Sequence, residues 1–182
     1  MKNRRFVASA LAGGLMLCAS SAMAAEPITL GVDGAFALPM GDWSDATGPM
    51  IGALLRLEYP ATPALAITGR IGYLYGLKKS TGDWKYGVND IPIWGGIKYY
   101  FNGVPDGLYV APELGLNFLS VSVEGPGGWD GSDSETKLGV NLGAGYKAGA
   151  LDFRGGLSMF DIDHAGDSMA LFANVGYNFT SF

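Results

Sequence analysis

The sequence has 182 residues, and its 12 Lys and Arg against 17 Asp and Glu give a formal net charge of −5. An acidic chain is a poor candidate for binding nucleic acid, because contacts to phosphate require Lys and Arg. The length fits a single domain. Twenty-nine glycines without a collagen-like repeat indicate many tight turns and closely approaching backbones.

The N-terminus has the pattern of a secretory signal peptide. Basic residues precede an apolar run over residues 6–17, and Ala22-Met23-Ala24 supplies an A-x-A cleavage site. The run is short for a transmembrane anchor, which needs about 20 apolar residues. We therefore expect residues 1–24 to be a cleaved signal peptide and residues 25–182 to form one β-barrel domain.

Loss of this segment would change the charge and the thiol content of the chain. It removes three basic residues and no acidic one, which takes the formal net charge from −5 to −8. It also removes Cys18, the only cysteine, so the exported domain would hold together without a disulfide in an oxidising compartment. Leu17 stands where a lipoprotein signal would place a small residue, which argues against lipidation of Cys18.

Alternation of apolar and polar residues repeats along the rest of the chain. A period of two indicates extended strands with one apolar and one wetter face. No segment after residue 25 shows sustained helical spacing. Eight segments alternate in this way: 28–38, 50–59, 64–77, 89–101, 108–120, 137–147, 151–160 and 171–179.

Two of these strands are expected to be irregular at one end. Pro92 lacks the N–H that a central strand donates, so the upper part of the fourth strand should be bulged or start late. Phe182 lies on the opposite parity to Phe179. We therefore expect the last strand to end at Phe179, with Thr180-Ser181-Phe182 as an overhang.

The connections between the strands alternate between short and long. Those after the second, fourth and sixth strands are short, whereas those after the other strands are longer and acidic. An up-and-down meander places alternate connections at opposite ends, and transmembrane barrels carry short turns at one end and longer loops at the other. The four longer connections span residues 39–49, 78–88, 121–135 and 161–168.

The composition of the charged face and the positions of the aromatic residues favour a membrane barrel over a soluble one; the side on which the charges lie does not decide, because in a soluble barrel they would point at water. All strand charges lie on the glycine-rich face, which suits the cramped lumen of a narrow barrel, and the opposite face carries none. Aromatic residues on the apolar face cluster toward the strand ends, as in the girdles of membrane barrels. The members of the two belts are Tyr59, Tyr99, Phe101, Phe153, Tyr177 and Phe179 at the turn end, and Phe36, Tyr73, Tyr75 and Phe118 toward the loop end.

Taken together, these features make the chain resemble the small outer-membrane barrels of the OmpA/OmpX type. Its most specific motif is Gly176-Tyr177-Asn178-Phe179, which is similar to the closing strand that those barrels present to the outer-membrane assembly machinery. The resemblance implies an all-β, closed, eight-stranded antiparallel barrel in the bacterial outer membrane, in contact with lipids and lipopolysaccharide. It does not fix a function, because such barrels serve as adhesins, anchors, narrow pores and lipid-modifying enzymes.

The charges on the lumen face have two interpretations. They form either a satisfied ion-pair network that plugs the barrel or the walls of a narrow ion pathway. Eight strands leave an interior just wide enough for side chains to fill, which favours the plug. The predicted network consists of Arg56, Glu58, Arg70, Asp90, Lys98, Glu113, Lys137, Asp152 and Arg154.

Two loop features are candidate contact sites. Trp43, Trp84 and Trp129 each follow or precede a Gly-Asp or Asp, and they either pack locally or form a contact surface for an unknown ligand. The acidic stretch 130–135 is either a solvated loop or a weak cation site, but it lacks the spacing of a calcium loop.

Catalysis finds little support. The only histidine, His164, has Asp163 and Ser168 nearby in the last long loop, but loop polarity alone explains this composition. We expect no enzymatic activity, no cofactor and no metal site. The predicted role is structural or surface interaction through the acidic loops; the alternatives are a narrow porin-like channel and a lipid-modifying enzyme.

Overall fold

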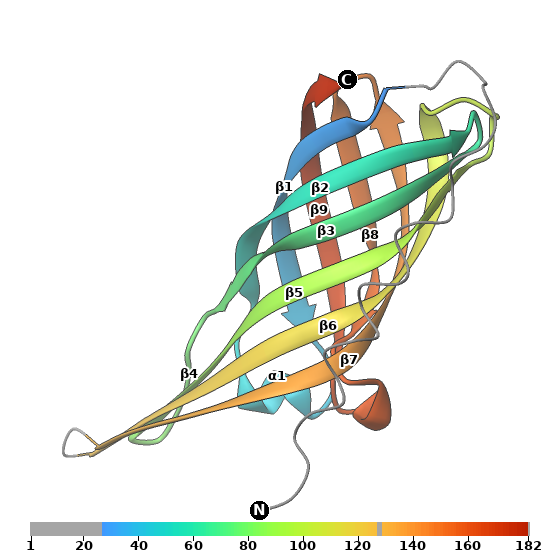
Figure 1. Ribbon diagram of the computed structural model, residues 1–182. Coiled ribbons are helices and arrows are strands. Elements are labelled where there is room, and N and C mark those ends of the chain that lie inside the picture. The colour runs from blue at the N-terminus through green and yellow to red at the C-terminus, as the bar shows by residue number, and fades with distance from the viewer. Residues whose placement is uncertain (1–26, 127–128, 182) are drawn as a thin grey trace, which may run out of the picture.

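The computed structural model describes residues 27–126 and 129–181, and most of this chain lies in antiparallel strands (Figure 1). The expected signal peptide with Cys18 lies outside these residues. The strands are β1 (Thr29–Pro39), β2 (Met50–Thr62), β3 (Leu65–Gly76), β4 (Lys79–Thr81), β5 (Trp84–Tyr100), β6 (Gly107–Gly125), β7 (Trp129–Ala148), β8 (Leu151–Met159) and β9 (Met169–Ser181). Two short helices, α1 (Trp43–Ala46) and the 3-10 helix η2 (Ile162–His164), lie after β1 and β8. None of the helices in the described ranges is long and apolar enough to cross a membrane.

Eight of the strands close into a ring. Successive strands pair antiparallel, β3 pairs with β5 past the short β4, and β1 pairs with β9. The predicted eight-stranded up-and-down barrel is therefore confirmed. The three-residue β4 was not predicted, and it pairs with the start of β5 at the loop end.

The two faces of the strands point as the charge pattern predicts. On β1, for example, Val32 and Phe36 are exposed on the outer surface, whereas Asp33 and Ala37 are buried in the lumen. All ten aromatic residues of the two predicted belts are exposed. The barrel thus has an apolar outer surface and a polar interior, the inverse of a soluble barrel.

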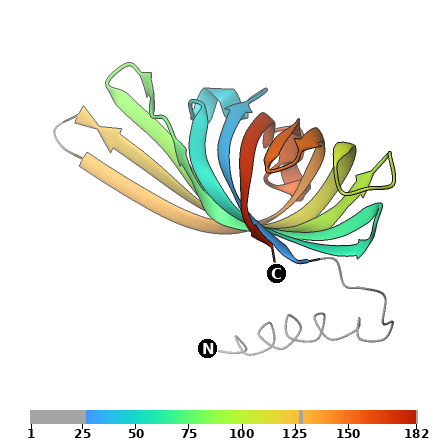
Figure 2. The same ribbon diagram turned by 90° about the horizontal axis from the view of Figure 1, so that it is seen from above.

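The loop end differs most from the prediction. β6 continues to Gly125 and β7 begins at Trp129, so most of the expected loop 121–135 is a long antiparallel hairpin. β5 likewise begins at Trp84, inside the expected loop 78–88. Figures 1 and 2 show this hairpin, with β4 and β5 beside it, reaching well past the rest of the loop end.

Pro92 does not delay its strand. β5 pairs with β6 straight through Pro92, which lies opposite Asn117. On the other side, pairing with β3 is present at Ile93 and at Asp90 but not at Pro92. The missing donor therefore costs a local interruption of one ladder. Both ladders keep the same register on either side of Pro92, so neither the expected bulge nor the expected late start is present.

The C-terminal overhang is also wrong for the residues that the structure describes. Thr180 and Ser181 continue β9 and pair with Leu30 and Thr29 of β1. A register shift leaves Phe179 as an extra residue between two paired positions. A bulge of this kind changes the alternation of side chains, so parity counted from Phe179 does not extend past it; Phe182 lies outside the described residues.

Lumen glycines let neighbouring backbones approach closely, which can be tested at Gly156. A methyl group there would overlap the Leu142 carbonyl, whereas one at the outer-surface Gly69 would meet nothing within 4 Å. We expect Gly156→Ala to lower the free energy of unfolding by about 1–3 kcal/mol, as overpacked sites do. Gly69→Ala, the matched control, should leave it unchanged or slightly higher. Urea unfolding of the refolded barrel measures both, and equal effects would contradict the packing argument.

Candidate functional site: the charged lumen and the loop-end surface

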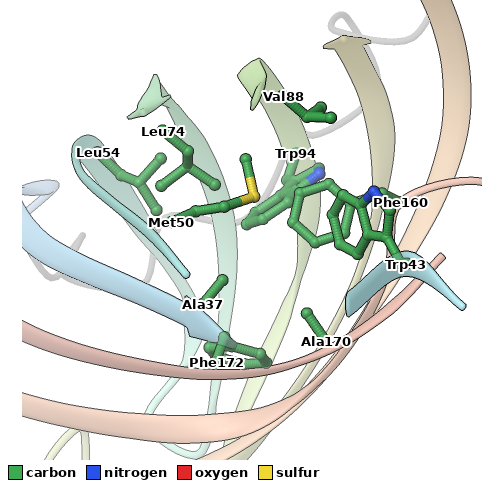
Figure 3. Close-up of a cluster of buried hydrophobic side chains, with 10 residues drawn as sticks. All are labelled: Ala37, Trp43, Met50, Leu54, Leu74, Val88, Trp94, Phe160, Ala170 and Phe172. Carbon is green, nitrogen blue, oxygen red and sulfur yellow. The ribbon is translucent and has the colours of Figure 1, made fainter. Parts of the chain in front are cut away.

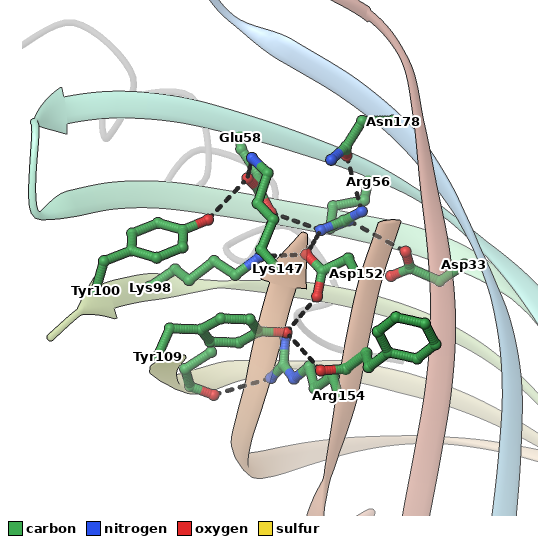
Figure 4. Close-up of polar contacts among 12 residues, drawn as sticks. Asp33, Arg56, Glu58, Lys98, Tyr100, Tyr109, Lys147, Asp152, Arg154 and Asn178 are labelled. Carbon is green, nitrogen blue, oxygen red and sulfur yellow. Dashed lines mark hydrogen bonds and ion pairs between the residues drawn. The ribbon is translucent and has the colours of Figure 1, made fainter. Parts of the chain in front are cut away.

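Four charged side chains form a closed ring of ion pairs inside the barrel (Figure 4). Arg56 contacts Glu58 at 2.6 Å and also Asp152. Lys98 contacts Glu58 at 2.7 Å and also Asp152. Arg56 and Glu58 belong to β2, Lys98 to β5 and Asp152 to β8, so the ring connects walls that are not neighbours in the sheet. None of the four residues is more than 4% exposed.

Each nitrogen of the Arg56 guanidinium group lies within 3.1 Å of a side-chain oxygen, although the contact of Nε with Asp33 is an ion pair without hydrogen-bond geometry. Besides the two carboxylates of the ring, its Nε lies 3.1 Å from Asp33 Oδ1 and its Nη2 donates to Asn178 Oδ1 at 3.0 Å. A guanidinium group has a fixed fork of donors, so this set of partners holds it in a single orientation.

The two acids of the ring have further donors as well. Lys147 Nζ lies 3.3 Å from Glu58 Oε2, and the Tyr109 hydroxyl donates to Asp152. The Lys98 ammonium also lies 4.0 Å from the centre of the Tyr109 ring, within reach of a cation–π interaction. Burial of the four ring charges is tolerable because each of them is paired and makes hydrogen bonds.

A second cluster lies around Glu113 of β6. Its Oε1 accepts from Arg154 Nη1 at 2.8 Å and lies 3.8 Å from Arg70 Nε. Arg154 also donates to the Ala111 carbonyl at 2.8 Å, and Arg70 lies over the Trp94 ring at 5.1 Å. The lumen charges therefore pair across several strands rather than along one wall.

An apolar cluster occupies the lumen toward the loop end (Figure 3). Trp43 of α1 packs against Phe160 with ring centres 4.5 Å apart, and Trp94 meets the same ring at 6.3 Å. Met50 and Leu54 are fully buried in this cluster. The other members are Ala37, Leu74, Val88, Ala170 and Phe172. We call these ten residues the apolar cap.

The interior of the described barrel contains little free space. A cavity of about 10 Å³ lies among the ion pairs of Arg56, Glu58 and Asp152, and another of about 10 Å³ lies beneath the cap beside Arg70 and Phe160. A single water molecule needs at least about 10–15 Å³ on this measure.

The structure places the nine predicted network residues in three ways. Seven of them join the ion pairs described above. Asp90 is fully buried between Leu74 and Leu119, and no ion-pair partner lies against it in the described chain. Lys137 lies at the rim, where it contacts Glu135 at 2.9 Å and Asp161 at 3.2 Å.

Four residues that lie in the lumen were not included in the predicted charge network. Asp33, Tyr100 and Tyr109 are buried in the lumen, and Lys147 pairs with Glu58. Asp33 was detectable, because it alternates with the apolar residues of its strand. The tyrosines carried no such signal, since an aromatic residue on the polar face is indistinguishable by type from a belt residue.

The three loop tryptophans do not share one environment. Trp43 is buried in the apolar cap, so it packs locally. Trp84 is 39% exposed at the start of β5. Trp129 begins β7 opposite Gly125, and its side chain lies outside the described residues. Tyr177 and Phe179 are exposed on the outer face of β9.

The polar groups of the last loop hold that loop together. Asp161 Oδ2 contacts His164 Nδ1 at 3.1 Å and Lys137 Nζ at 3.2 Å, and Asp161 Oδ1 accepts from the Asp163 N–H at 3.0 Å. Partial burial acts to raise the pKa of Asp161, but these donors hold it below its usual range. Ser168 Oγ donates to the Asp161 carbonyl and accepts from the Asp161 N–H.

Polarity is inverted in the hairpin beyond the rim. Register places Val88 and Tyr86 of β5 opposite Val121 and Val123 of β6, on the parity that faces the lumen lower down. The opposite parity of β6, which is apolar against lipid, is polar here: Ser120, Ser122 and Glu124. In the projecting sheet, β5 and β6 therefore have an apolar inner face and a polar outer face, whereas β7 carries Asp133 and Glu135 on its inner face.

A family model described as the outer membrane protein beta-barrel domain matches residues 9–179. The chain belongs to this family. No curated protein sequence matches the chain.

Solved structures of outer-membrane barrels share the fold. Ail, the attachment invasion locus protein of Yersinia pestis, is 15% identical with a TM-score of 0.58, covering 86% of this chain and 100% of Ail. Ail in complex with the heparin analogue sucrose octasulfate is 13% identical with a TM-score of 0.55. That comparison covers 85% of this chain and 97% of the Ail chain. Neisserial surface protein A is 16% identical with a TM-score of 0.47, and the comparison covers 85% of this chain and 97% of that protein's chain. The Ail structures support the architecture of this outer-membrane barrel, and the family places it in the bacterial outer membrane.

Asp152 is the residue of the ion-pair ring whose substitution should cost the most stability, because it pairs with both cations of the ring. Asp152→Asn would leave Arg56 and Lys98 short of a buried counter-charge, so we expect the free energy of unfolding to fall by about 3–5 kcal/mol. Adding Lys98→Met should restore part of this loss, because the unpaired cation leaves with its partner.

The exposed Lys78–Glu124 pair at the loop end supplies the control. Glu124→Gln should hardly alter stability, because exposed ion pairs contribute little. Urea titration in detergent micelles compares the variants. If Asp152→Asn were as mild as Glu124→Gln, the ring would have no structural role.

Proposed function

We propose that this outer-membrane barrel is a non-enzymatic surface-interaction protein whose lumen is closed by its own side chains. The observation that carries the proposal is the sheet of β4, β5, β6 and β7, which continues beyond the lipid-facing belts (Figure 1). A barrel that served only as an anchor would have no use for such an extension. The paired part of the hairpin beyond Ser120 would project by about 15–20 Å at 3.4 Å per residue.

Closure of the lumen is supported by two layers. The ion-pair ring and the Glu113 cluster fill the section below the apolar cap, and the cavities between them hold about one water molecule each. Permeation of a hydrated ion would require charged side chains to separate and the aromatic rings of the cap to move apart.

The absence of catalysis is likewise a proposal from the geometry. Both Ser168 and His164 direct their polar atoms at Asp161, in a loop whose hydrogen bonds are local. A nucleophile needs a base within hydrogen-bond reach and a third group that orients the base. These contacts instead give the two side chains a role in holding the loop.

The charge of the loop end selects among partners. The four predicted connections contain ten Asp and Glu against three Lys. Ail binds the heparin analogue sucrose octasulfate in its crystal, but a polyanion would be repelled by so acidic a surface. We propose a cationic partner for this chain, with lipids and lipopolysaccharide as its surroundings in the membrane.

We also propose how the chain reaches the outer membrane. Residues 1–24 act as the cleaved export signal, and Tyr177 and Phe179 on the closing strand are recognised by the outer-membrane assembly machinery. The exposure of both side chains on the outer face of β9 supports the second point.

A closed lumen predicts an electrically silent protein. In planar bilayers the refolded barrel should give no steady conductance. Insertion is verified in the same preparation by the altered gel mobility of the folded barrel without boiling. Steady single-channel steps would contradict closure and favour the narrow-channel alternative.

The surface role is tested by removing the hairpin alone. Ser120 and Ser134 lie opposite each other, so an Asn-Gly turn between them replaces residues 121–133 with a tight two-residue connection. Bacteria that express the full chain should be retained on immobilised basic proteins, but not on acidic proteins or heparin. Retention should fall to background with the shortened chain. Unchanged retention would refute the proposed role.

A further inference from the structure

The two groups of ion pairs in the lumen differ in their charge balance. The ring and the side chains that contact it contain three cations and three carboxylates: Arg56, Lys98 and Lys147 against Asp33, Glu58 and Asp152. The second cluster instead sets the single carboxylate of Glu113 against two guanidinium groups, those of Arg70 and Arg154. All three of these side chains are at most 8% exposed. The second cluster therefore buries one positive charge without a counter-charge.

Arg70 is the less well neutralised of the two guanidinium groups. Its Nε lies 3.8 Å from Glu113 Oε1, whereas Arg154 Nη1 donates to the same oxygen at 2.8 Å. Its two Nη atoms lie 3.0 and 3.1 Å from the amide oxygen of Asn174 when that amide is turned to satisfy both groups, but an amide oxygen carries no formal charge. Asp90, the other acid in the lumen, has no ion-pair partner against it in the described chain. A buried charge without a counter-charge is destabilising, so an anion beside Arg70 would stabilise the fold.

A cavity of about 10 Å³ borders Arg70 beneath the apolar cap. Trp94 and Phe172, the rings that lie against Arg70 and Arg154, form part of its wall. Ser158 also lines this cavity. Its side chain is 1% exposed, and its hydroxyl has no hydrogen-bond partner in the described chain. The cavity is thus bordered by a guanidinium group and by an unpartnered hydroxyl.

The charge and the size of the cavity select the kind of ligand. No Asp or Glu is among the described residues that line it, whereas Asp33, Glu58 and Asp152 line the other internal cavity. An anion is attracted by Arg70 and can accept from the Ser158 hydroxyl, while a cation would meet no negative charge there. A volume of about 10 Å³ is close to that of one water-sized sphere, which excludes phosphate, sulfate and carboxylates. The cavity fits only a monatomic anion.

We propose that a single chloride ion binds in this cavity, against the Arg70 guanidinium group and the Ser158 hydroxyl, and balances the charge of the lumen. The inference goes beyond the proposed surface role, because it concerns the interior of the barrel. The apolar cap closes the lumen toward the loop end, so the ion enters as the barrel folds.

Chloride binding to the folded barrel is measured through stability. Unfolded protein freed of chloride is refolded in zwitterionic micelles, and sodium chloride then replaces sodium gluconate at constant ionic strength. Gluconate is too large for the cavity, so the exchange changes the ligand but not the screening of charges. We expect the unfolding equilibrium constant at a fixed urea concentration to fall about tenfold for each tenfold rise in chloride above its dissociation constant.

Ser158→Ala and Ser132→Ala form a matched pair, since Ser132 is exposed on β7 outside the lumen. In gluconate, Ser158→Ala should be at least as stable as the wild type, because the variant loses a buried hydroxyl without a partner. In chloride it should be less stable than the wild type, and its dissociation constant for chloride should rise about tenfold or more with the loss of a charge-assisted hydrogen bond. Ser132→Ala should follow the wild type in both salts.

Arg70→Met removes the unbalanced cation and leaves Glu113 paired with Arg154. This variant should lose the dependence on chloride altogether. Gel mobility without boiling verifies that each variant folds. Should Arg70→Met fail to fold, Ser158→Ala and the position of a bound bromide decide the question.

Crystals of the barrel refolded in bromide give that position. Anomalous scattering should show one bromide in the cavity, beside the Arg70 guanidinium group and Ser158 Oγ. The inference is overturned by the absence of bromide from the cavity, by equal stability of the wild type in chloride and gluconate, or by equal chloride dependence of the wild type and Ser158→Ala. A barrel that is silent in planar bilayers but indifferent to chloride would keep its closed lumen and lose only the anion site.

Discussion

The hydrocarbon of a membrane leaves no water for an unpaired backbone N–H or C=O, so each strand within it must be paired on both edges. The ring of eight strands meets this requirement through the β1–β9 and β3–β5 pairings. It also locates the boundary of the hydrocarbon on β7, whose second ladder ends at Val140. An edge that is open beyond this residue belongs in water. The polarity inversion of the neighbouring β5 and β6 begins further out, at Val88 and Val121, because Val121 pairs with Asp133, seven residues beyond Val140 on β7.

Closure of a narrow barrel turns its polar face inward, and the charges on that face must then be neutralised within the lumen. Glycine makes this possible by giving long side chains room. A methyl group at Gly143 would overlap the Arg154 guanidinium group, and one at Gly31 or Gly176 would crowd Arg56. The glycine-rich face in the sequence is thus the complement of the arginines that cross the lumen. Such buried pairs add less stability than their number suggests, since desolvation offsets much of the Coulomb attraction. What they fix is the arrangement of the walls.

The positions of the strands and the direction of their faces could be predicted from the sequence, but the contacts between distant residues could not. Alternation is a local signal, so it located the eight strands and placed eight of the nine predicted charges inside the barrel. Which charges meet depends on register and strand tilt around the ring, and Arg56 and Asp152 are 96 positions apart. The hairpin was missed because its apolar parity reverses at Val121, which ends the pattern on which the prediction relied. The bulge at Phe179 defeated parity at the C-terminus in the same way.

The chemistry of the open edge of β7, beyond Val140, follows from where it stands. Lysine is the usual guard of an exposed strand, because a long cation disfavours pairing with a neighbour. Acids on residues 130–135 repel copies of the same chain, whose edges carry the same charges. They also repel an anionic lipid surface. An edge that carries Asp130, Asp133 and Glu135 consequently repels both of the anionic surfaces that it can meet in an outer membrane. Protection against self-pairing and protection against the lipid surface are therefore one electrostatic property of the same few residues.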